Sequence, residues 1–309
     1  FPTGLKWGFV PKGDGPKYLI CNNDESEPGT FKDGYLCRTS PHMVIEGMII
    51  AGFAVNANKG YIYTRWEYDE EIRCLEEAIR EAYEAGLLGK NIAGSGFDFD
   101  LDHYRGAGAY ICGEETGLIS SLEGKKGQPK LKPPFPAVEG YLAKPTVVNN
   151  TETLANVPWI INNGPDAFKK FGTEKSTGTK LFSISGALNK PGVYEVPLGY
   201  NFEKFINEEA GGMAPGKKLK AVVPGGMSAP VLTPEELKGL TMDFEALAGA
   251  GSMLGSGAIM IIDEDQNMAE MLKITVDFFA HESCGQCTPC REGTGWLANI
   301  ISGIHDHKG

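Results

Sequence analysis

The chain has 309 residues, of which 41% are hydrophobic and 22% are charged, and its formal net charge at pH 7 is −11. This length predicts about two or three globular domains, and the composition is sufficient to bury a hydrophobic core. The negative charge gives no electrostatic support to a nucleic-acid partner and opposes binding to anionic lipid head groups. No apolar run reaches the roughly 18 residues of a membrane span, so we expect no direct membrane insertion.

The seven cysteines do not form the pattern of a disulfide framework, because three of them are clustered near the end of the chain. A cluster of this kind indicates a reducing compartment. The sequence has no signal peptide and begins at Phe1 rather than at methionine. We expect both ends of the chain to be truncated.

The first half of the chain alternates strand-like and helix-like segments. Residues 17–22 form an apolar run typical of a buried strand, and residues 61–65 alternate β-branched and aromatic side chains as a second strand would. A Ser-Pro pair predicts the start of a buried helix over residues 40–54, and an amphipathic helix is expected over residues 69–86. This order predicts a parallel sheet flanked by helices in one three-layer α/β domain.

The second half has a different pattern. Short β-like runs surround one helix candidate at residues 202–209, which predicts a small separate α+β domain. These runs are residues 180–185, 192–195, 221–223 and 258–262. Residues 268–281 have a helical pattern, and residues 296–304 look helical again, so we expect the cysteine cluster in a loop between two helices.

The cysteine cluster follows the pattern Cys-x-x-Cys-x-x-Cys at Cys284, Cys287 and Cys290, with a glycine and a proline to bend the backbone. Thiolates at this spacing can point at one centre, as iron–sulfur ligation requires. A cubane cluster normally takes a fourth thiolate, and no cysteine follows Cys290. Zinc and free structural thiols remain alternatives on spacing alone. For the other four cysteines, which are scattered among apolar neighbours, we expect buried structural thiols.

Two segments of the first half carry acidic side chains at places where ligands bind in α/β proteins. The turn at residues 22–29 has three carboxylates directly after a strand, which indicates either a ligand site or a solvated acidic turn. The glycine-rich segment 105–116 fails the dinucleotide motif, because Ile111 stands where the third glycine is required. Glu114 and Glu115 begin the next helix, where they would repel a phosphate but suit ribose hydroxyls or a flavin ring.

A phosphate is better placed at the helix N-terminus that follows Asn149 and Asn150, where free backbone N–H groups are expected. Lys6 and Lys132 are candidates to supply positive charge. Aromatic rings that can stack on a bound ring, or else anchor loops in the core, are those of Phe1, Phe9 and Phe135.

Six motifs, taken together, resemble the NADH-binding flavoprotein subunit of respiratory complex I and its relatives in NAD-linked hydrogenases and formate dehydrogenases. They are FPTGLKW at 1–7, NNDESEPG at 22–29, RGAGAYICGEET at 105–116, LKPPFP at 131–136, VNNTET at 148–153 and ESCGQCTPCREG at 282–293. Each motif is modest alone, but all six occur in the family's order over essentially the whole chain. Their joint specificity is therefore very high.

The resemblance implies an α/β fold class with three domains. A Rossmann-like FMN- and NADH-binding domain would span residues 1–175, and a ubiquitin-like (β-grasp) domain residues 176–264. Residues 265–309 would begin a helical bundle that carries a [4Fe–4S] cluster. The implied activity is NADH dehydrogenation: a hydride passes from nicotinamide C4 to flavin N5, and single electrons then pass to the cluster and through complex I to quinone.

The resemblance also implies the residues around each cofactor. Those around FMN are Asn22, Asp24, Gly113, Asn149, Asn150 and Thr151. Those expected near NADH are Phe1, Lys6, Phe9, Glu25, Glu27, Glu115, Lys132 and Phe135, and Glu114 is counted with the cofactor-binding residues. The cluster ligands would be Cys284, Cys287 and Cys290. We expect Glu115 to favour NADH over NADPH, because a carboxylate near the adenosine ribose would repel a 2′-phosphate.

The implied partners are NADH, a thioredoxin-like [2Fe–2S] subunit and the large iron–sulfur subunit of the same complex. The implied location is the cytoplasmic face of a bacterial inner membrane, as a peripheral subunit, or the mitochondrial matrix side. The chain lacks the family's glycine-rich flavin loop and its fourth cluster cysteine, which fits truncation at both ends. The alternatives are a diaphorase subunit of a soluble hydrogenase, formate dehydrogenase or electron-bifurcating complex, and a zinc-stabilised scaffold.

Overall fold

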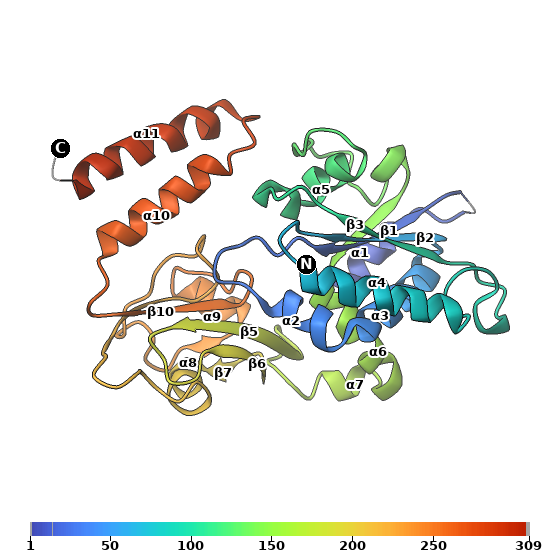
Figure 1. The fold of residues 1–309 in the computed structure, drawn as a ribbon. Coiled ribbons are helices and arrows are strands. Elements are labelled where there is room, and N and C mark those ends of the chain that lie inside the picture. The colour runs from blue at the N-terminus through green and yellow to red at the C-terminus, as the bar shows by residue number, and fades with distance from the viewer. Residues whose placement is uncertain (1, 14, 307–309) are drawn as a thin grey trace. The chain divides into compact units, whose positions relative to one another are not determined.

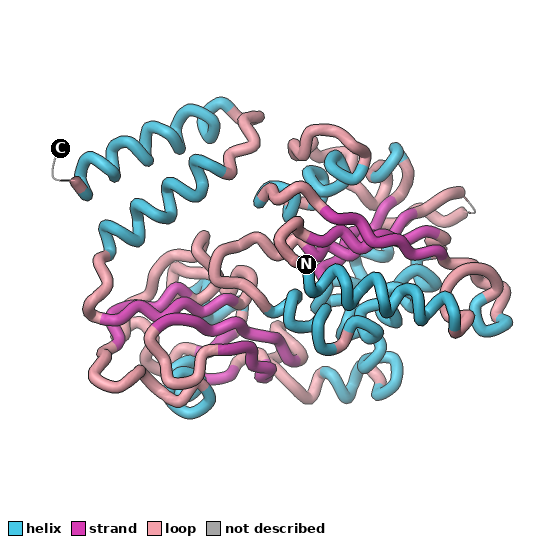
Figure 2. The backbone as a smooth tube through the Cα atoms, viewed as in Figure 1, coloured by secondary structure: helices cyan, strands magenta, loops and turns pink. Residues whose placement is uncertain are grey.

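The computed structural model describes residues 2–13 and 15–306, and the chain divides into two compact units. Unit 1 consists of residues 1–26 and 33–164, and unit 2 consists of residues 27–32 and 165–309. Each unit has a sheet of its own, drawn as arrows in Figure 1 and in magenta in Figure 2.

Unit 1 is built on a four-stranded sheet in the order β3-β2-β1-β4, in which every neighbouring pair is parallel. The strands are β1 (Tyr18–Asn23), β2 (Lys59–Thr64), β3 (Asp100–Arg105) and β4 (Thr146–Asn150). The parallel sheet predicted from the sequence is confirmed. Because all four strands run in one direction, their carboxyl ends meet at one edge, where α/β proteins bind their ligands.

Helices cover both faces of this sheet. Alternate strand residues point to opposite faces, so Leu19 and Val147 pack on one side while Ile20 and Val148 pack on the other. The first side is covered by α3 (Pro41–Val55), α4 (Asp69–Glu84) and α6 (Thr151–Asn163), and the second by α5 (Glu115–Leu122). Further helical segments are α1 (Thr3–Gly8), α2 (Lys32–Thr39), η1 (Ile92–Gly94), η2 (Tyr110–Gly113) and η3 (Tyr141–Ala143).

Two local predictions for unit 1 need correction. The helix predicted over residues 40–54 is present as α3, but it is not buried all round, because Phe53 is 66% exposed. The sequence also did not predict α2, whose composition is a poor helix signal. The N-terminus of α2 is stabilised from a distance: the two carboxylate oxygens of Glu25 accept from the backbone N–H groups of Asp33 and Gly34, each at 2.9 Å. Because this cap comes from a residue outside the helix and its flanking positions, the sequence around α2 carries no capping pattern.

Unit 2 contains a mixed sheet in the order β6-β5-β10-β8. The central pair, β5 and β10, is parallel, and the two outer pairs are antiparallel. The strands are β5 (Thr179–Gly186), β6 (Gly192–Pro197), β8 (Leu219–Val223) and β10 (Ala258–Asp263), with β7 (Tyr200–Asn201) paired to β9 (Thr241–Met242). The helical segments of this part are α7 (Pro165–Phe168), α8 (Phe202–Lys204), η4 (Phe205–Glu209) and α9 (Phe244–Gly249). Fully buried Phe182, Phe202 and Phe205 form the centre of its core.

The segment 27–32 is fixed within unit 2 by hydrogen bonds. The backbone N–H of Ser228 donates to Oε1 of Glu27 at 2.6 Å, and that of Met227 donates to the carbonyl of Pro28 at 3.1 Å. The N–H of Phe31 donates to Oγ of Ser183 at 3.0 Å. The chain therefore leaves unit 1 after Ser26, within the acidic turn, is bonded within unit 2 over residues 27–32 and continues in unit 1 with α2.

The C-terminal helices, α10 (Met268–His281) and α11 (Thr288–His305), lie side by side in Figure 1 and contact each other. Neither helix has a buried residue in the described part of the chain, and large apolar side chains such as Trp296 and Ile300 are exposed. The loop predicted around the cysteine cluster holds for Cys284 and Cys287, whereas Cys290 lies in the first turn of α11.

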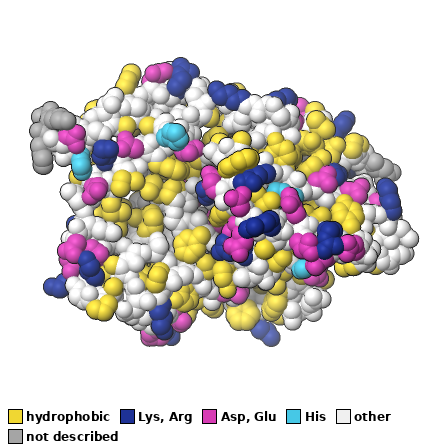
Figure 3. All heavy atoms as spheres, viewed as in Figure 1, with side chains coloured by type: hydrophobic (Ala, Val, Ile, Leu, Met, Phe, Trp, Pro, Cys, Tyr) yellow, Lys and Arg dark blue, Asp and Glu magenta, His cyan; other side chains and the backbone are white. Residues whose placement is uncertain are grey.

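Charged side chains are paired rather than segregated. Figure 3 shows acidic and basic side chains intermixed on the face in view. Examples on unit 1 are the ion pairs of Arg80 with Glu77 and Glu84 and of Arg105 with Asp69. Within residues 2–13 and 15–306, each helix is too short or too polar to cross a bilayer.

Candidate functional site at the carboxyl edge of the unit 1 sheet

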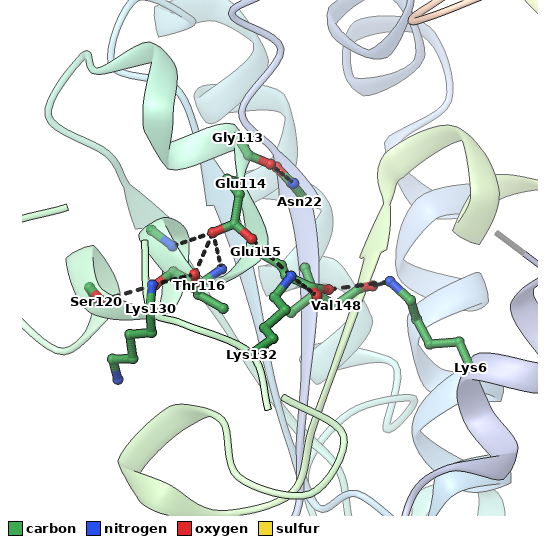
Figure 4. Close-up of polar contacts among 11 residues, drawn as sticks. Lys6, Asn22, Gly113, Glu114, Glu115, Thr116, Ser120, Lys130, Lys132 and Val148 are labelled. Carbon is green, nitrogen blue, oxygen red and sulfur yellow. Dashed lines mark hydrogen bonds and ion pairs between the residues drawn. The ribbon is translucent and has the colours of Figure 1, made fainter. Parts of the chain in front are cut away.

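Three segments that are far apart in the sequence meet at the carboxyl edge of the unit 1 sheet. The side-chain amide of Asn22, at the end of β1, donates from Nδ2 to the carbonyl of Gly113 at 2.8 Å (Figure 4). Thr151, at the start of α6, donates from Oγ1 to the carbonyl of Asn22 at 3.3 Å. The acidic turn, the glycine-rich segment and the Asn-Asn segment therefore form one site, as their common place at strand ends predicts.

The glycine-rich segment ends in a carboxylate that caps α5. Oε2 of Glu114 accepts from the backbone N–H groups of Thr116 and Gly117 at 2.8 and 3.0 Å, and Oε1 pairs with Nζ of Lys132 at 3.0 Å. Burial alone would raise the pKa of Glu114, but the bonds from Thr116, Lys132 and Gly117 outweigh it and lower the pKa below its usual value. The N-terminus of α5 is thus occupied by the protein's own anion.

Glu115, the next residue, is held between two lysines. Lys132 approaches its Oε1 at 2.7 Å, and Lys6 approaches its Oε2 at 3.4 Å (Figure 4). Nζ of Lys6 also donates to the carbonyl of Val148 on β4 at 3.0 Å. These contacts join α1, α5 and the loop before β4 into one charged wall in which two carboxylates face two ammonium groups.

This wall borders a cavity of about 620 Å³ within unit 1. Phe9 and Phe135 line it with half-exposed rings. The remaining lining is largely apolar and comprises Pro136, Ala137, Val138, Thr146 and Val148, together with Lys6 and Glu115. An apolar cavity with a few charged groups at one wall is typical of a small-molecule site.

Several residues that were predicted to bind a ligand form hydrogen bonds within the chain instead. Glu25 is buried, caps α2 and accepts from the Tyr68 hydroxyl at 2.8 Å. Burial raises the pKa of Tyr68, and the neighbouring Glu25 raises it further, so this hydroxyl stays protonated and remains a donor. Asn150 caps α6 by accepting from the N–H of Glu152 at 3.0 Å, and its Nδ2 donates to Asp33 at 2.6 Å. These side chains shape the loops of the site.

Three further predicted site residues also form hydrogen bonds within the chain. Asp24 accepts a hydrogen bond from the Ser26 hydroxyl within the acidic turn, while Glu27 is bonded within unit 2. Asn149 is buried and accepts from the indole N–H of Trp7 at 2.8 Å. Phe1 lies outside the described residues. Trp7 and Tyr68 were not predicted as site residues. The sequence signal for Trp7 is its place in the first motif, FPTGLKW.

The cysteine cluster lies at the surface. Cys287 occupies the N-cap position of α11 and Cys290 its first turn, where the helix dipole favours negative charge. Sγ of Cys290 lies 3.3 Å from Oγ of Ser283. Among residues 2–13 and 15–306, no three Cys, His, Asp or Glu side chains converge as a metal site. The donor types suit a cluster, but the thiols are not gathered around one point.

The cysteines outside the cluster are mainly core residues, as expected. Cys21, Cys37 and Cys112 are buried, and Cys74 is partly buried. Burial raises the pKa of Cys21 to about 12, so it stays a thiol under physiological conditions.

Comparison with known proteins identifies the class. Residues 1–159 match the family model described as the Nuo51 FMN-binding domain. Residues 270–309 match the model described as the NADH-ubiquinone oxidoreductase-F iron-sulfur binding region. The chain is therefore an oxidoreductase with FMN and a [4Fe–4S] cluster as its cofactors and NADH as its substrate, which confirms the cofactors predicted from the sequence.

The chain is 52% identical over 310 residues to the NADH-quinone oxidoreductase F 2 subunit of Rhizobium meliloti, and 49% identical over 311 residues to the NADH-quinone oxidoreductase F subunit of Escherichia coli. These alignments cover the whole chain and 73% and 70% of the relatives. The chain belongs to the family of NADH-quinone oxidoreductase F subunits, as its motifs indicated. A crystal structure of an NAD⁺-reducing [NiFe]-hydrogenase in the air-oxidized state is similar, with a TM-score of 0.87 at 39% sequence identity. The match covers 99% of this chain and 51% of the hydrogenase chain.

Proposed function

We propose that the cavity of unit 1 binds NADH and that the adjoining carboxyl edge of the sheet binds FMN. The observation that carries this proposal is the pairing of Glu115 with Lys6 and Lys132 at the wall of the cavity. The cavity volume of about 620 Å³ suits one nucleoside end of a dinucleotide. Phe9 and Phe135 offer ring faces to the adenine, and the lysines offer positive charge to the pyrophosphate.

The carboxyl edge has two features that suit FMN. A Cβ added at Gly113 would meet only the carbonyl of Asp24, at 3.5 Å, so this backbone is open to a close-lying ring. Asn149 is a nearly buried amide whose oxygen is already bonded to Trp7. When bound, FMN accepts a hydride from NADH and releases the electrons singly. The contribution of the chain is to place the two ligands against each other.

The side chains that form hydrogen bonds within the chain would hold the backbone of the site in place. Glu25 and Asn150 fix the starts of α2 and α6, while Asn22 and Thr151 connect β1 to the loops on either side. Such a rigid frame keeps the positions of two ligands constant through turnover. Asp24 remains the carboxylate of the acidic turn that we assign to FMN.

Electrons would leave through the cysteine cluster. Cys284, Cys287 and Cys290 supply three of the four thiolates that a [4Fe–4S] cluster takes, and two of them lie at the N-terminus of α11. Because metal binding and local folding are coupled, we expect cluster binding to gather these thiols.

The order of strands in unit 2 supports a ubiquitin-like assignment. A parallel central pair, β5 and β10, flanked by antiparallel outer strands and packed on one short helical segment, is the arrangement that a β-grasp domain has. We therefore propose an FMN- and NADH-binding domain at residues 1–175, a β-grasp domain at residues 176–264 and the start of a helical iron–sulfur domain at residues 265–309.

The relatives are named as subunits, so we propose that the chain works within a multisubunit complex. Its partners would be a thioredoxin-like [2Fe–2S] subunit and a large iron–sulfur subunit, and quinone would be the final acceptor. The location that follows is peripheral, on the cytoplasmic face of a bacterial inner membrane or on the matrix side.

The second candidate function is the diaphorase subunit of a soluble NAD-linked enzyme. It is favoured by the match to the NAD⁺-reducing hydrogenase over 99% of the chain. The higher identity to the curated quinone oxidoreductase subunits, 52% against 39%, favours the first function. Identification of the subunits that copurify with the protein distinguishes the two.

The role of Glu115 tests the NADH assignment. Glu115→Gln leaves Lys6 and Lys132 without this shared carboxylate, so a 2′-phosphate should be better tolerated. We expect the ratio of kcat/KM for NADPH to that for NADH to rise roughly tenfold. The matched control is Glu139→Gln, which removes an exposed carboxylate that does not line the NADH cavity. An unchanged ratio in Glu115→Gln would contradict the assignment.

A further inference from the structure

Two consecutive residues of α1 reach the end of β4. Lys6 donates to the backbone carbonyl of Val148 at 3.0 Å, and the indole N–H of Trp7 donates to Oδ1 of Asn149 at 2.8 Å. The Trp7 ring also packs against the core on the α3 side of the sheet. Helix α1 has six residues and none of them is buried, so these contacts fix it against the strand.

The chemistry of this pair determines which way the Asn149 amide faces. An indole N–H can only donate, whereas an asparagine amide has an accepting oxygen and a donating nitrogen. The oxygen of Asn149 must therefore face Trp7. Nδ2, with its two hydrogens, must point the other way.

That nitrogen has no acceptor among the residues that the structure describes. Asn149 is only 7% exposed, yet no residue within 2–13 and 15–306 accepts a hydrogen bond from its Nδ2. Asn150 next to it differs, because its oxygen caps α6 and its nitrogen donates to Asp33. The nitrogen is not among the buried side-chain atoms that lack a partner, so it reaches solvent and is accessible to a ligand at this edge.

Asn149 lies at the same end of the sheet as the residues already assigned to the flavin. In the β1–β4 register it pairs with Cys21, and Cys21 precedes Asn22, whose amide bonds to Gly113. A ligand at this edge that accepts from Nδ2 must offer a carbonyl, a ring nitrogen or a phosphate or ribityl oxygen, and FMN has all of these.

We propose that Trp7 is a positioning residue that holds the Asn149 amide with Nδ2 presented to an acceptor atom of FMN. This inference rests on the proposed function of the edge. Without the indole donor, the amide can turn over and present its oxygen, which repels an acceptor atom. Trp7 thus acts on FMN through Asn149.

The first measurement is the dissociation constant of FMN, followed by the quenching of flavin fluorescence in the intact protein. Trp7→Phe keeps an aromatic ring and removes the donor, and we expect it to raise the FMN dissociation constant roughly two- to tenfold, the range of one neutral hydrogen bond. The matched control is Trp159→Phe, which changes an exposed indole on α6 of the same unit and should leave the constant unaltered. Wild-type affinity in Trp7→Phe would overturn the role of Trp7.

A double-mutant cycle separates positioning from a general structural effect. Asn149→Ala removes the amide, so there is nothing left to orient, and adding Trp7→Phe should weaken FMN binding no further. Full additivity of the two changes would overturn the proposal. If Trp7→Phe does not fold, Asn149→Asp decides alone, because aspartate still accepts from Trp7 but has no donor for FMN. Wild-type FMN affinity in Asn149→Asp would then overturn the proposal.

FMN binding by the wild-type protein distinguishes failure of the positioning role of Trp7 from failure of the proposed FMN site. If it binds FMN and the cycle is additive, only the positioning role of Trp7 is wrong. If it binds no FMN, the proposed function of the edge is wrong as well.

Discussion

The carboxyl edge of the unit 1 sheet and the cysteine cluster of unit 2 are built in different ways. At the edge, Glu25, Glu114 and Asn150 each cap a helix, so these three side chains are bonded within the chain. In the cluster, Cys287 and Cys290 are exposed, and the described residues of α10 and α11 include none that is buried.

We infer that the first region is preorganised and that the second is organised by the cluster it binds. A preformed frame suits a site that would hold FMN in one position while NADH enters and leaves the adjoining cavity at every turnover. A resident metal cluster can supply its own binding energy to local folding. Changes at the edge should therefore alter protein stability, whereas changes in the cluster should alter metal content and little else.

The largest effect is expected in the cysteine cluster. Cys287→Ala should abolish the iron–sulfur absorption and electron paramagnetic resonance signals, because a cluster cannot be held by two of these thiolates. Oxidation of NADH by an artificial acceptor should persist, since that reaction needs only the flavin. The control is Cys74→Ala, which alters a thiol of unit 1 outside the cluster. Loss of FMN together with the cluster signal would show that the two regions are not independent.

A smaller effect, on stability, is expected at Glu25. Glu25→Ala leaves two backbone N–H groups and the Tyr68 hydroxyl without their buried acceptor. We expect the free energy of unfolding in urea to fall by about 3 kcal/mol, with Gln at the same position costing less. Glu84→Ala, on the exposed face of α4, is the control and should change it by less than about 0.5 kcal/mol. A change of that small size in Glu25→Ala would argue against a preorganised edge.

The smallest effect is a pH dependence at Glu114, whose pKa is lowered in the folded protein. Below the unfolded value of roughly 4.3 the unfolded chain binds more protons at this group, so its contribution to stability is lost as pH falls through the folded pKa. Above the unfolded value the contribution is fully present. Glu114→Gln should lose stability less steeply than the wild type between about pH 5 and pH 3 in urea unfolding. Equal slopes would mean that Lys132 and the helix N-terminus do not stabilise this carboxylate.

Much of the architecture was predictable because its signals are local. The apolar run at β1 and the Ser-Pro start of α3 predicted a parallel α/β unit, and the motifs predicted the family. The cap that Glu25 provides to α2 was not predictable, because it joins residues that are separated by a turn anchored in unit 2. The bond from Trp7 to Asn149 spans 142 positions of the sequence and has no local pattern at all.

The site was predictable by position but not by role. Glu114 and Glu115 are neighbours with the same side chain, yet one caps a helix and the other lines the cavity of unit 1. Asn149 and Asn150 divide in the same way, into a residue with an available donor and a residue engaged at both ends. For the asparagines, alternation of side chains at the end of β4 makes this division, whereas Glu114 and Glu115 are the N-cap and the first residue of α5.

The most direct test of the central claim is the visible spectrum of the anaerobically purified protein before and after NADH is added. We expect a flavin band together with broad iron–sulfur absorption, and we expect NADH to bleach the flavin band. A colourless protein that contains zinc and does not respond to NADH would contradict it.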